Sequence, residues 1–372
     1  MTFWLINIII FGGYSLLLYR MNKKDVFLIV AFLHLGLVAA LRGLNVGSDT
    51  LYYANAYKVL AYRGHIRNHA MASSPGFIGY MKLISYIFPD RNGYMISTAI
   101  PILLGAFVLI KNFSKNYFAS VYLYLTFYFY FLSMNISRQF LAIAMTLFCY
   151  YFLNKGKKLW ALILYIAALS VHSAAIIFGV YFVLHLIKWT EKRVLAAGVC
   201  LLFGSSLIPR MLNIFVRIFP NYQWMLENSF ITNYASGGRS AMVITVYSIF
   251  AVLLMLYWIL WSKKKLMLSF GGSKLCARSG MNEAEIQMGY ELILMLLIVA
   301  VIEIFYPTVI IFTRMVNTLF VYIIILLPNA LQNMARYRKI VSLAVMAPLV
   351  AYMWMQIAGD YSGVLNYTFY GF

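Results

Sequence analysis

The sequence has 372 residues, of which 63% are hydrophobic and 11% are charged, and its mean hydropathy is +0.82. A soluble domain carries roughly 25% charged residues, so this composition excludes a soluble globular protein and indicates an integral membrane protein surrounded by membrane lipids. The formal net charge of +20 would indicate nucleic acid binding in a soluble protein, but lysines and arginines gather in the cytoplasmic loops of membrane proteins, so no nucleic acid partner is expected.

Apolar runs long enough for a helix to cross a core about 30 Å thick recur along the chain, without the alternation of barrel strands. The first run is followed by basic residues and has no small-residue cleavage site, so we expect it to remain as a span. The predicted fold is an all-α integral membrane protein, a GT-C-like polytopic bundle of about twelve transmembrane helices in one domain, residues 1–372. The predicted spans are about residues 2–19, 26–41, 94–110, 117–134, 138–153, 159–171, 173–187, 194–212, 241–262, 290–306, 309–328 and 340–356.

The basic turns between these spans all fall on one side of the membrane if the N-terminus lies outside, and the positive-inside rule makes that side cytoplasmic. The outer side then has a large helical periplasmic loop at residues 42–93, a second loop at 213–240 and a tail at 357–372. Residues 73–89 are short for a span and contain Lys82, so we expect them to re-enter the membrane or to lie on its surface. Residues 263–289 are predicted to be a cytoplasmic loop.

The distribution of arginines is not explained by the positive-inside rule. On the predicted topology the outer side has nine arginines and two lysines, whereas the inner side has 14 lysines and 5 arginines. Arginine binds phosphate oxygens through two parallel hydrogen bonds and stays charged in a partly apolar site. We therefore predict that a phosphate-bearing anion is held on the outer side, the alternative being that these side chains extend to lipid headgroups. Four of them stand at span boundaries: Arg42, Arg138, Arg239 and Arg314.

Two outer residues are candidates for a general base. Asp49 either caps the helix that follows it, or pairs with an outer arginine or orients a sugar hydroxyl. His172 lies where two predicted spans join, and it is either a hydrogen-bonded interfacial residue or a proton acceptor. Tyr52 and Tyr53 follow Asp49 on the same helix and are candidates to stack on sugar rings.

Glu303 lies one span before Arg314 and is expected to neutralise its charge. The three cysteines share no CxxC spacing, and HExxH, P-loop, GxGxxG and DxD patterns are absent from the sequence. We therefore expect neither a metal site nor a cofactor.

Four stretches, in this order, resemble the EpsG-like and Wzy-type polysaccharide repeat-unit polymerases. "LRGLNVGSDTLYYANAY" is similar to the R-x-x-x-x-G-S/T-D-x-x-x-Y signature of their first large outer loop, and "SSPGFIGYMKLIS" to the EPGF segment that follows, with Ser74 where a glutamate is common. "SRQFLAIAMTLFCYYFL" and "LSVHSAAIIF" resemble their R-Q-x-x-A and H-x-S/T-A stretches. The resemblance covers about residues 40–190, and beyond them only the hydropathy is similar.

The resemblance implies an enzyme of the bacterial inner membrane with its active site facing the periplasm. It would be an O-antigen or exopolysaccharide polymerase, a glycosyltransferase that moves the growing glycan from undecaprenyl diphosphate to a hydroxyl of a new undecaprenyl-diphosphate-linked repeat unit. Its implied partners are these lipid-linked oligosaccharides, with a chain-length regulator and a flippase of the same pathway. The residues that match the family's motifs are Arg42, Asp49, Arg138 and His172.

The predicted mechanism needs no metal. Arg42, Arg138, Arg239 and Arg314 bind the diphosphate, and either His172 or Asp49 deprotonates the acceptor hydroxyl, whose attack inverts the anomeric carbon. The predicted supporting residues are Gln139, Tyr52, Tyr53 and Glu303.

Two other functions share part of this chemistry. A flippase for lipid-linked oligosaccharides would need cationic groups along a path open to both sides, whereas the middle parts of the spans are mostly apolar. An O-antigen ligase-like transferase has the same leaving group, so only the motif match separates it from a polymerase.

Overall fold

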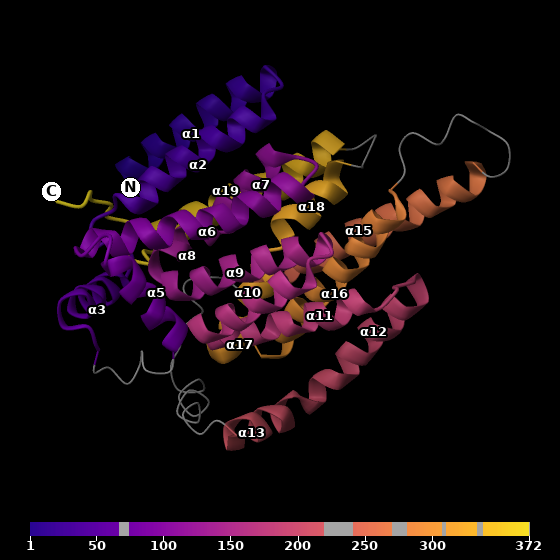
Figure 1. The fold of residues 1–372 in the computed structure, drawn as a ribbon. Coiled ribbons are helices and arrows are strands. Elements are labelled where there is room, and N and C mark those ends of the chain that lie inside the picture. Colours follow the sequence, from indigo (N-terminus) through magenta and orange to yellow (C-terminus); the bar gives the residue numbers. More distant parts are fainter. Residues whose placement is uncertain (67–73, 219–240, 270–280, 307–309, 333–337, 372) are drawn as a thin grey trace. The chain divides into compact units, whose positions relative to one another are not determined.

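A computed structural model describes residues 1–66, 74–218, 241–269, 281–306, 310–332 and 338–371 (Figure 1). These residues form helices and short connections, and the only strand-like feature among them is an isolated antiparallel bridge between Arg42 and Phe369. The helices divide into two compact units. Unit 1 comprises Met1–Ile176 and Ala344–Phe372, and unit 2 comprises Ile177–Leu343.

Unit 1 contains α1 to α3, α5 to α10 and most of α19. Small residues bring two of its central helices close together, since a Cβ at Gly105 of α6 would lie 3.0 Å from the Cα of Ala144 in α9. Between α7 and α8 the chain bends by 49° at Tyr128, whose φ is 67°. The bounds are α1 (Thr2–Arg20), α2 (Lys24–Ala40), α3 (Thr50–Arg63), α5 (Pro75–Ser85), α6 (Arg91–Phe113), α7 (Tyr117–Thr126), α8 (Phe129–Asn135), α9 (Ser137–Asn154), α10 (Lys158–Val171) and α19 (Arg338–Ala358), with the 3-10 helix η1 (Ser173–Phe178) after α10.

Unit 2 is built around α16, along which α15 packs (Figure 1). A capping box starts α16, because the Asn282 side chain accepts from the Glu285 amide and the Glu285 carboxylate accepts from the Asn282 amide. The bounds are α11 (Gly179–Leu186), α12 (Glu191–Gly204), η2 (Ser205–Leu207), α13 (Ile208–Ile218), α15 (Ala241–Ser269), α16 (Glu283–Phe305), α17 (Ile310–Phe320) and α18 (Ile323–Gln332).

The apolar helices indicate a membrane protein. Among the described residues six helices are long and apolar enough to cross a membrane, or eight if each of two bent helix pairs is one span. The predicted number of about twelve is not confirmed, because several of the predicted spans are short helices. For example, α10 has 14 residues and is about 21 Å long at 1.5 Å per residue, against an apolar core of about 30 Å.

The described residues of the range 42–93 include α3, α5 and the start of α6. With 11 residues, α5 is about 17 Å long, which is roughly half of the apolar thickness of a bilayer. Of the other predicted loops, residues 219–240 and 270–280 lie outside the described residues, and α15 extends to Ser269. The side of the membrane on which each loop lies stays a prediction.

Candidate functional site

Four predicted site residues belong to unit 1 and stand at helix ends. Arg42 follows α2, Asp49 precedes α3, Arg138 is the second residue of α9, and His172 follows α10. Backbone N–H and C=O groups at helix ends lack intrahelical partners, so side chains and loops there must supply hydrogen bonds. In unit 1 those loops bring the four residues into one polar region, which we call the helix-end cluster.

Arg42 is the most buried residue of the helix-end cluster, with 1% of its surface exposed. Its Nη1 donates to the carbonyl of Ala39, its Nη2 donates to the carbonyl of Met134 at 3.3 Å, and its Nε has no hydrogen-bond partner. Burial lowers the pKa of the guanidinium from its ordinary value. In this structure Arg42 therefore joins the end of α2 to the end of α8.

The same Met134 carbonyl also holds the loop before α3. Thr50 Oγ1 donates to it at 3.0 Å, and the Asp49 amide donates to Asn135 Oδ1 at 2.9 Å. Gly47 has a φ of 94°, and a Cβ there would lie 2.5 Å from the Met134 oxygen. Only glycine allows this turn and this close approach.

Asp49 occupies the N-cap position of α3, but its side chain makes no capping hydrogen bond to that helix, all of which is described. The predicted role of the Asp49 carboxylate as a helix cap is therefore not seen in this structure. The backbone of Asp49 is fixed by Asn135. The Tyr94 hydroxyl shares a hydrogen bond with Ser137, the residue before Arg138.

Arg138 is held by groups from two other helices. Its Nη1 donates to Ser74 Oγ at 3.1 Å, and its guanidinium carbon lies 6.0 Å from the centre of the Tyr53 ring, which is within reach of a cation–π interaction. The Tyr53 ring in turn contacts Tyr52, with 5.4 Å between ring centroids. The neighbouring predicted residue, Gln139, is 3% exposed.

His172 is buried, and its Nδ1 accepts a hydrogen bond from the Ala174 amide at 3.1 Å. It thereby satisfies an amide at the start of the 3-10 helix η1. Because Nδ1 is the acceptor, the neutral ring carries its proton on Nε2. That nitrogen is a hydrogen-bond donor in this tautomer.

The first turn of α5 connects Arg138 to His172. Pro75 stands at the first helical position, which suits its missing N–H and fixed φ, and Ser74 before it meets Arg138. A Cβ at Gly76 would lie 2.0 Å from Ser170 Oγ and 2.9 Å from the Ser170 carbonyl carbon. The backbone of α5 therefore lies directly against the end of α10, two residues before His172.

The remaining predicted residues are elsewhere. Glu303 is buried on α16 and Arg314 lies on α17, both in unit 2, and their mutual neutralisation stays a prediction. Arg239 lies outside the described residues. The predicted binding of one diphosphate by Arg138, Arg239 and Arg314 likewise stays a prediction.

Unit 2 has an ionisable cluster that the sequence analysis missed. Glu291, 4% exposed, accepts from the Tyr181 hydroxyl at 2.8 Å and faces His185 Nδ1 at 3.2 Å. The sequence signal was a carboxylate inside an apolar helix, which is unfavourable without partners. These contacts join α11 to α16.

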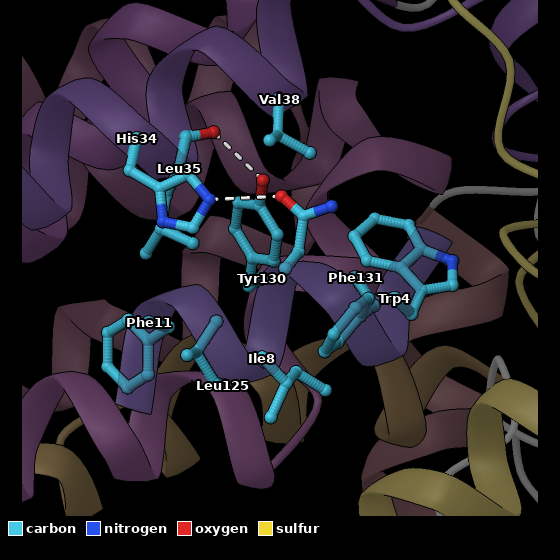
Figure 2. A pocket seen from close by; sticks show the side chains of 10 residues that line it. Trp4, Ile8, Phe11, His34, Leu35, Val38, Leu125, Tyr130 and Phe131 are labelled. Carbon is cyan, nitrogen blue, oxygen red and sulfur yellow. Dashed lines mark hydrogen bonds between the residues drawn. The ribbon is translucent and has the colours of Figure 1, made fainter. Parts of the chain in front are cut away.

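Figure 2 shows the side chains that line a small crevice in unit 1, which is partly open to its surroundings. Its lining is mostly apolar, and its polar groups include Asn7 Oδ1, which lies 3.0 Å from His34 Nε2, and the Tyr130 hydroxyl, which donates to the Leu35 carbonyl at 2.8 Å. None of the predicted site residues lines this crevice. The Tyr130 bond ties α8 to α2 and so helps to place Met134.

The helix-end cluster contains groups of the kinds that anion binding and proton transfer use. Arg138 supplies a guanidinium, His172 an N–H donor and Asp49 a carboxylate. In the described part of the chain no three His, Cys, Asp or Glu side chains lie close enough together to hold a metal ion.

Comparison with known proteins gives one match. A family model described as the EpsG family matches residues 25–369, a range that contains every predicted site residue. No curated protein and no solved structure matches the chain at a significant level.

Proposed function

Because the chain belongs to the EpsG family, we propose that it is a polysaccharide polymerase. Its proposed reaction is the polymerisation of lipid-linked oligosaccharide repeat units. The enzyme lies in the bacterial inner membrane with about twelve spans, and the helix-end cluster faces the periplasm. The growing glycan leaves undecaprenyl diphosphate and joins a hydroxyl of a new undecaprenyl-diphosphate-linked repeat unit. A flippase and a chain-length regulator of the same pathway act beside it.

The observation that carries this proposal is the placement of Arg138 between Ser74 and Tyr53, in one unit with Asp49 and His172. When the glycosidic bond to diphosphate breaks, negative charge develops on the leaving oxygen. A preorganised guanidinium stabilises that charge without a metal. Arg42 contributes further positive charge, Tyr52 and Tyr53 contact the sugars, and Gln139 supports Arg138.

We assign the role of general base to Asp49, and to His172 the role of hydrogen-bond donor to the diphosphate. The acceptor hydroxyl gives its proton to the Asp49 carboxylate, and its oxygen forms a bond to the anomeric carbon of the donor glycan. The bond from that carbon to the diphosphate oxygen breaks, the electron pair leaves with undecaprenyl diphosphate, and the anomeric configuration inverts. The lone pair of His172 Nδ1 is occupied by the Ala174 amide, so this ring offers Nε2–H to the diphosphate.

The experiment that tests the function is a chromosomal deletion followed by gel analysis of the surface glycan. Polymerase function predicts that the ladder of long chains disappears while a single repeat unit remains attached. Loss of the single repeat as well would point to export or ligation, and an unchanged ladder would refute all three functions.

Replacing Gly76 with alanine is expected to lower the rate of chain lengthening about 10-fold or more, because small misplacements at a reactive centre have large kinetic effects. The added Cβ would overlap Ser170, so α5 must move and the Ser74 bond to Arg138 is lost. The rate of glycan extension by the purified enzyme measures this.

The matched control is Gly79→Ala in the same helix, where an added Cβ meets nothing within 4 Å. Alanine also favours a helix over glycine, so this variant should extend glycans normally. Equal rates for the Gly76 and Gly79 variants would show that the contact of α5 with α10 does not matter to the reaction.

A further inference from the structure

The C-terminal segment, residues 359–371, lies along the loop that carries Arg42 and Asp49. The Gly43 amide donates to the Thr368 carbonyl at 2.7 Å, and the Tyr370 amide donates to the Leu41 carbonyl at 2.9 Å. These two bonds flank the antiparallel bridge between Arg42 and Phe369. The segment therefore pairs with this loop as a short added strand does with a sheet edge.

A second pair of bonds lies at the other end of the loop. The Gly47 amide donates to the Gly363 carbonyl at 2.7 Å, and the Ser48 amide donates to the Ser362 carbonyl at 3.2 Å. Ser48 is the residue immediately before Asp49. The C-terminal segment thus contacts both ends of the loop, next to the guanidinium at one end and next to the carboxylate at the other.

The segment is itself anchored to the rest of unit 1. The Trp4 indole donates to the Val364 carbonyl at 2.6 Å, and the Tyr367 hydroxyl donates to the Val38 carbonyl at 2.7 Å. The Tyr367 ring stacks on Phe3 with 3.7 Å between ring centroids. These contacts fix the segment to α1 and to the last turns of α2, so the carbonyls that it offers to the loop have defined positions.

A turn at the start of the segment directs its carbonyls toward the loop. Asp360 Oδ1 accepts from the Leu365 amide at 2.8 Å. Gly363 has a φ of 66°, and a Cβ there would lie 2.8 Å from the Ser48 amide nitrogen. Glycine is therefore required at this position both for the backbone conformation and for the approach to Ser48.

The loop is also held by the end of α8, through the bonds to Met134 and Asn135. We propose that the C-terminal segment is a positioning element of the helix-end cluster: it holds the loop against α8 so that Asp49 reaches the acceptor hydroxyl, and it stays docked during turnover. The catalytic part of this inference rests on the proposed polymerase function, whereas the docking itself does not.

The first experiment compares two glycine variants in the segment. Gly363→Ala places a Cβ against the Ser48 amide, whereas Gly371→Ala, at a φ of 91°, meets nothing within 4 Å. Both alanines take an unfavourable positive φ, but only the alanine at position 363 places a Cβ against the loop. We expect Gly363→Ala to lower chain lengthening at saturating donor about 10-fold or more with normal amounts of protein in the membrane, and Gly371→Ala to leave the rate unchanged.

A second readout does not depend on activity. Val46 in the loop is fully buried, at 0% exposed, so Val46→Cys, in a chain whose own three cysteines are replaced by serine, reports loop opening through its labelling by a water-soluble maleimide. We expect faster labelling when Gly363→Ala or a deletion of residues 360–372 is added, and no change with Gly371→Ala. Unchanged labelling, or normal chain lengthening by the Gly363 variant, would overturn the positioning role. If the proposed polymerase function itself fails, the labelling rates still decide whether the segment holds the loop.

A cysteine pair tests whether the segment stays docked. The Thr368 hydroxyl donates to Asn45 Oδ1, so the two side chains are adjacent, and Asn45→Cys with Thr368→Cys allows them to be joined by oxidation. We expect the oxidised protein to lengthen chains at a rate within about 2-fold of that of the reduced protein, because a segment that stays docked does not have to move during the reaction. A loss of activity on oxidation that a reductant restores would show that the segment has to leave, and would overturn this part of the proposal.

Discussion

Replacing Arg138 with lysine is expected to reduce chain lengthening about 100-fold or more, the usual effect of removing one donor to a developing negative charge. Lysine keeps the positive charge but loses the planar fork that binds two phosphate oxygens at once. It also loses the defined position that Ser74 and Tyr53 give to the guanidinium. The rate of glycan extension from a lipid-linked repeat unit measures the effect, with the amount of protein in the membrane as a check on folding.

Arg63→Lys is the matched control for this variant. Arg63 lies in the last turn of α3 in the same unit and its side chain is exposed. The same loss of a guanidinium there should leave the rate of chain lengthening within about 2-fold of the wild-type rate, as expected for a surface substitution. A normal rate for the Arg138 variant would mean that the diphosphate is bound elsewhere.

Replacing Asp49 with asparagine is expected to lower the rate of chain lengthening by about 100- to 10,000-fold, the usual contribution of a general base. Asparagine has nearly the same shape and still accepts hydrogen bonds, but it does not take up a proton at neutral pH. The Asp49 amide bond to Asn135 is made by the backbone, so the loop should keep its conformation. The measurement is the turnover rate at saturating donor and acceptor.

The control is the same substitution at Asp360, whose side chain accepts from the Leu365 amide. Asparagine can accept this bond and tolerates the φ of 50° at this position, so Asp360→Asn should be fully active. If Asp49→Asn retains more than about a tenth of the activity, Asp49 is not the base, and His172 becomes the alternative base.

The sequence located four residues of the helix-end cluster through motifs and through the ends of apolar runs. It did not predict what each of them contacts. Arg42 was expected to bind phosphate, and it donates in this structure to two backbone carbonyls, one of them 92 residues away in sequence. Ser74 was noted only as a departure from the usual glutamate, and it proves to be the hydrogen-bond partner of Arg138.

By itself the sequence determined the all-helical, membrane-type character of the chain, because apolar composition and hydrophobic runs act over a few neighbouring residues. Only the tertiary structure decided that residues 359–371 support the Arg42 to Asp49 loop and that Glu291 lies against Tyr181 and His185. These contacts join residues far apart along the chain, for example Leu41 and Tyr370, which are 329 positions apart. Their hydrogen bonds form only after the helices have packed, since packing brings together donors and acceptors that no local pattern relates.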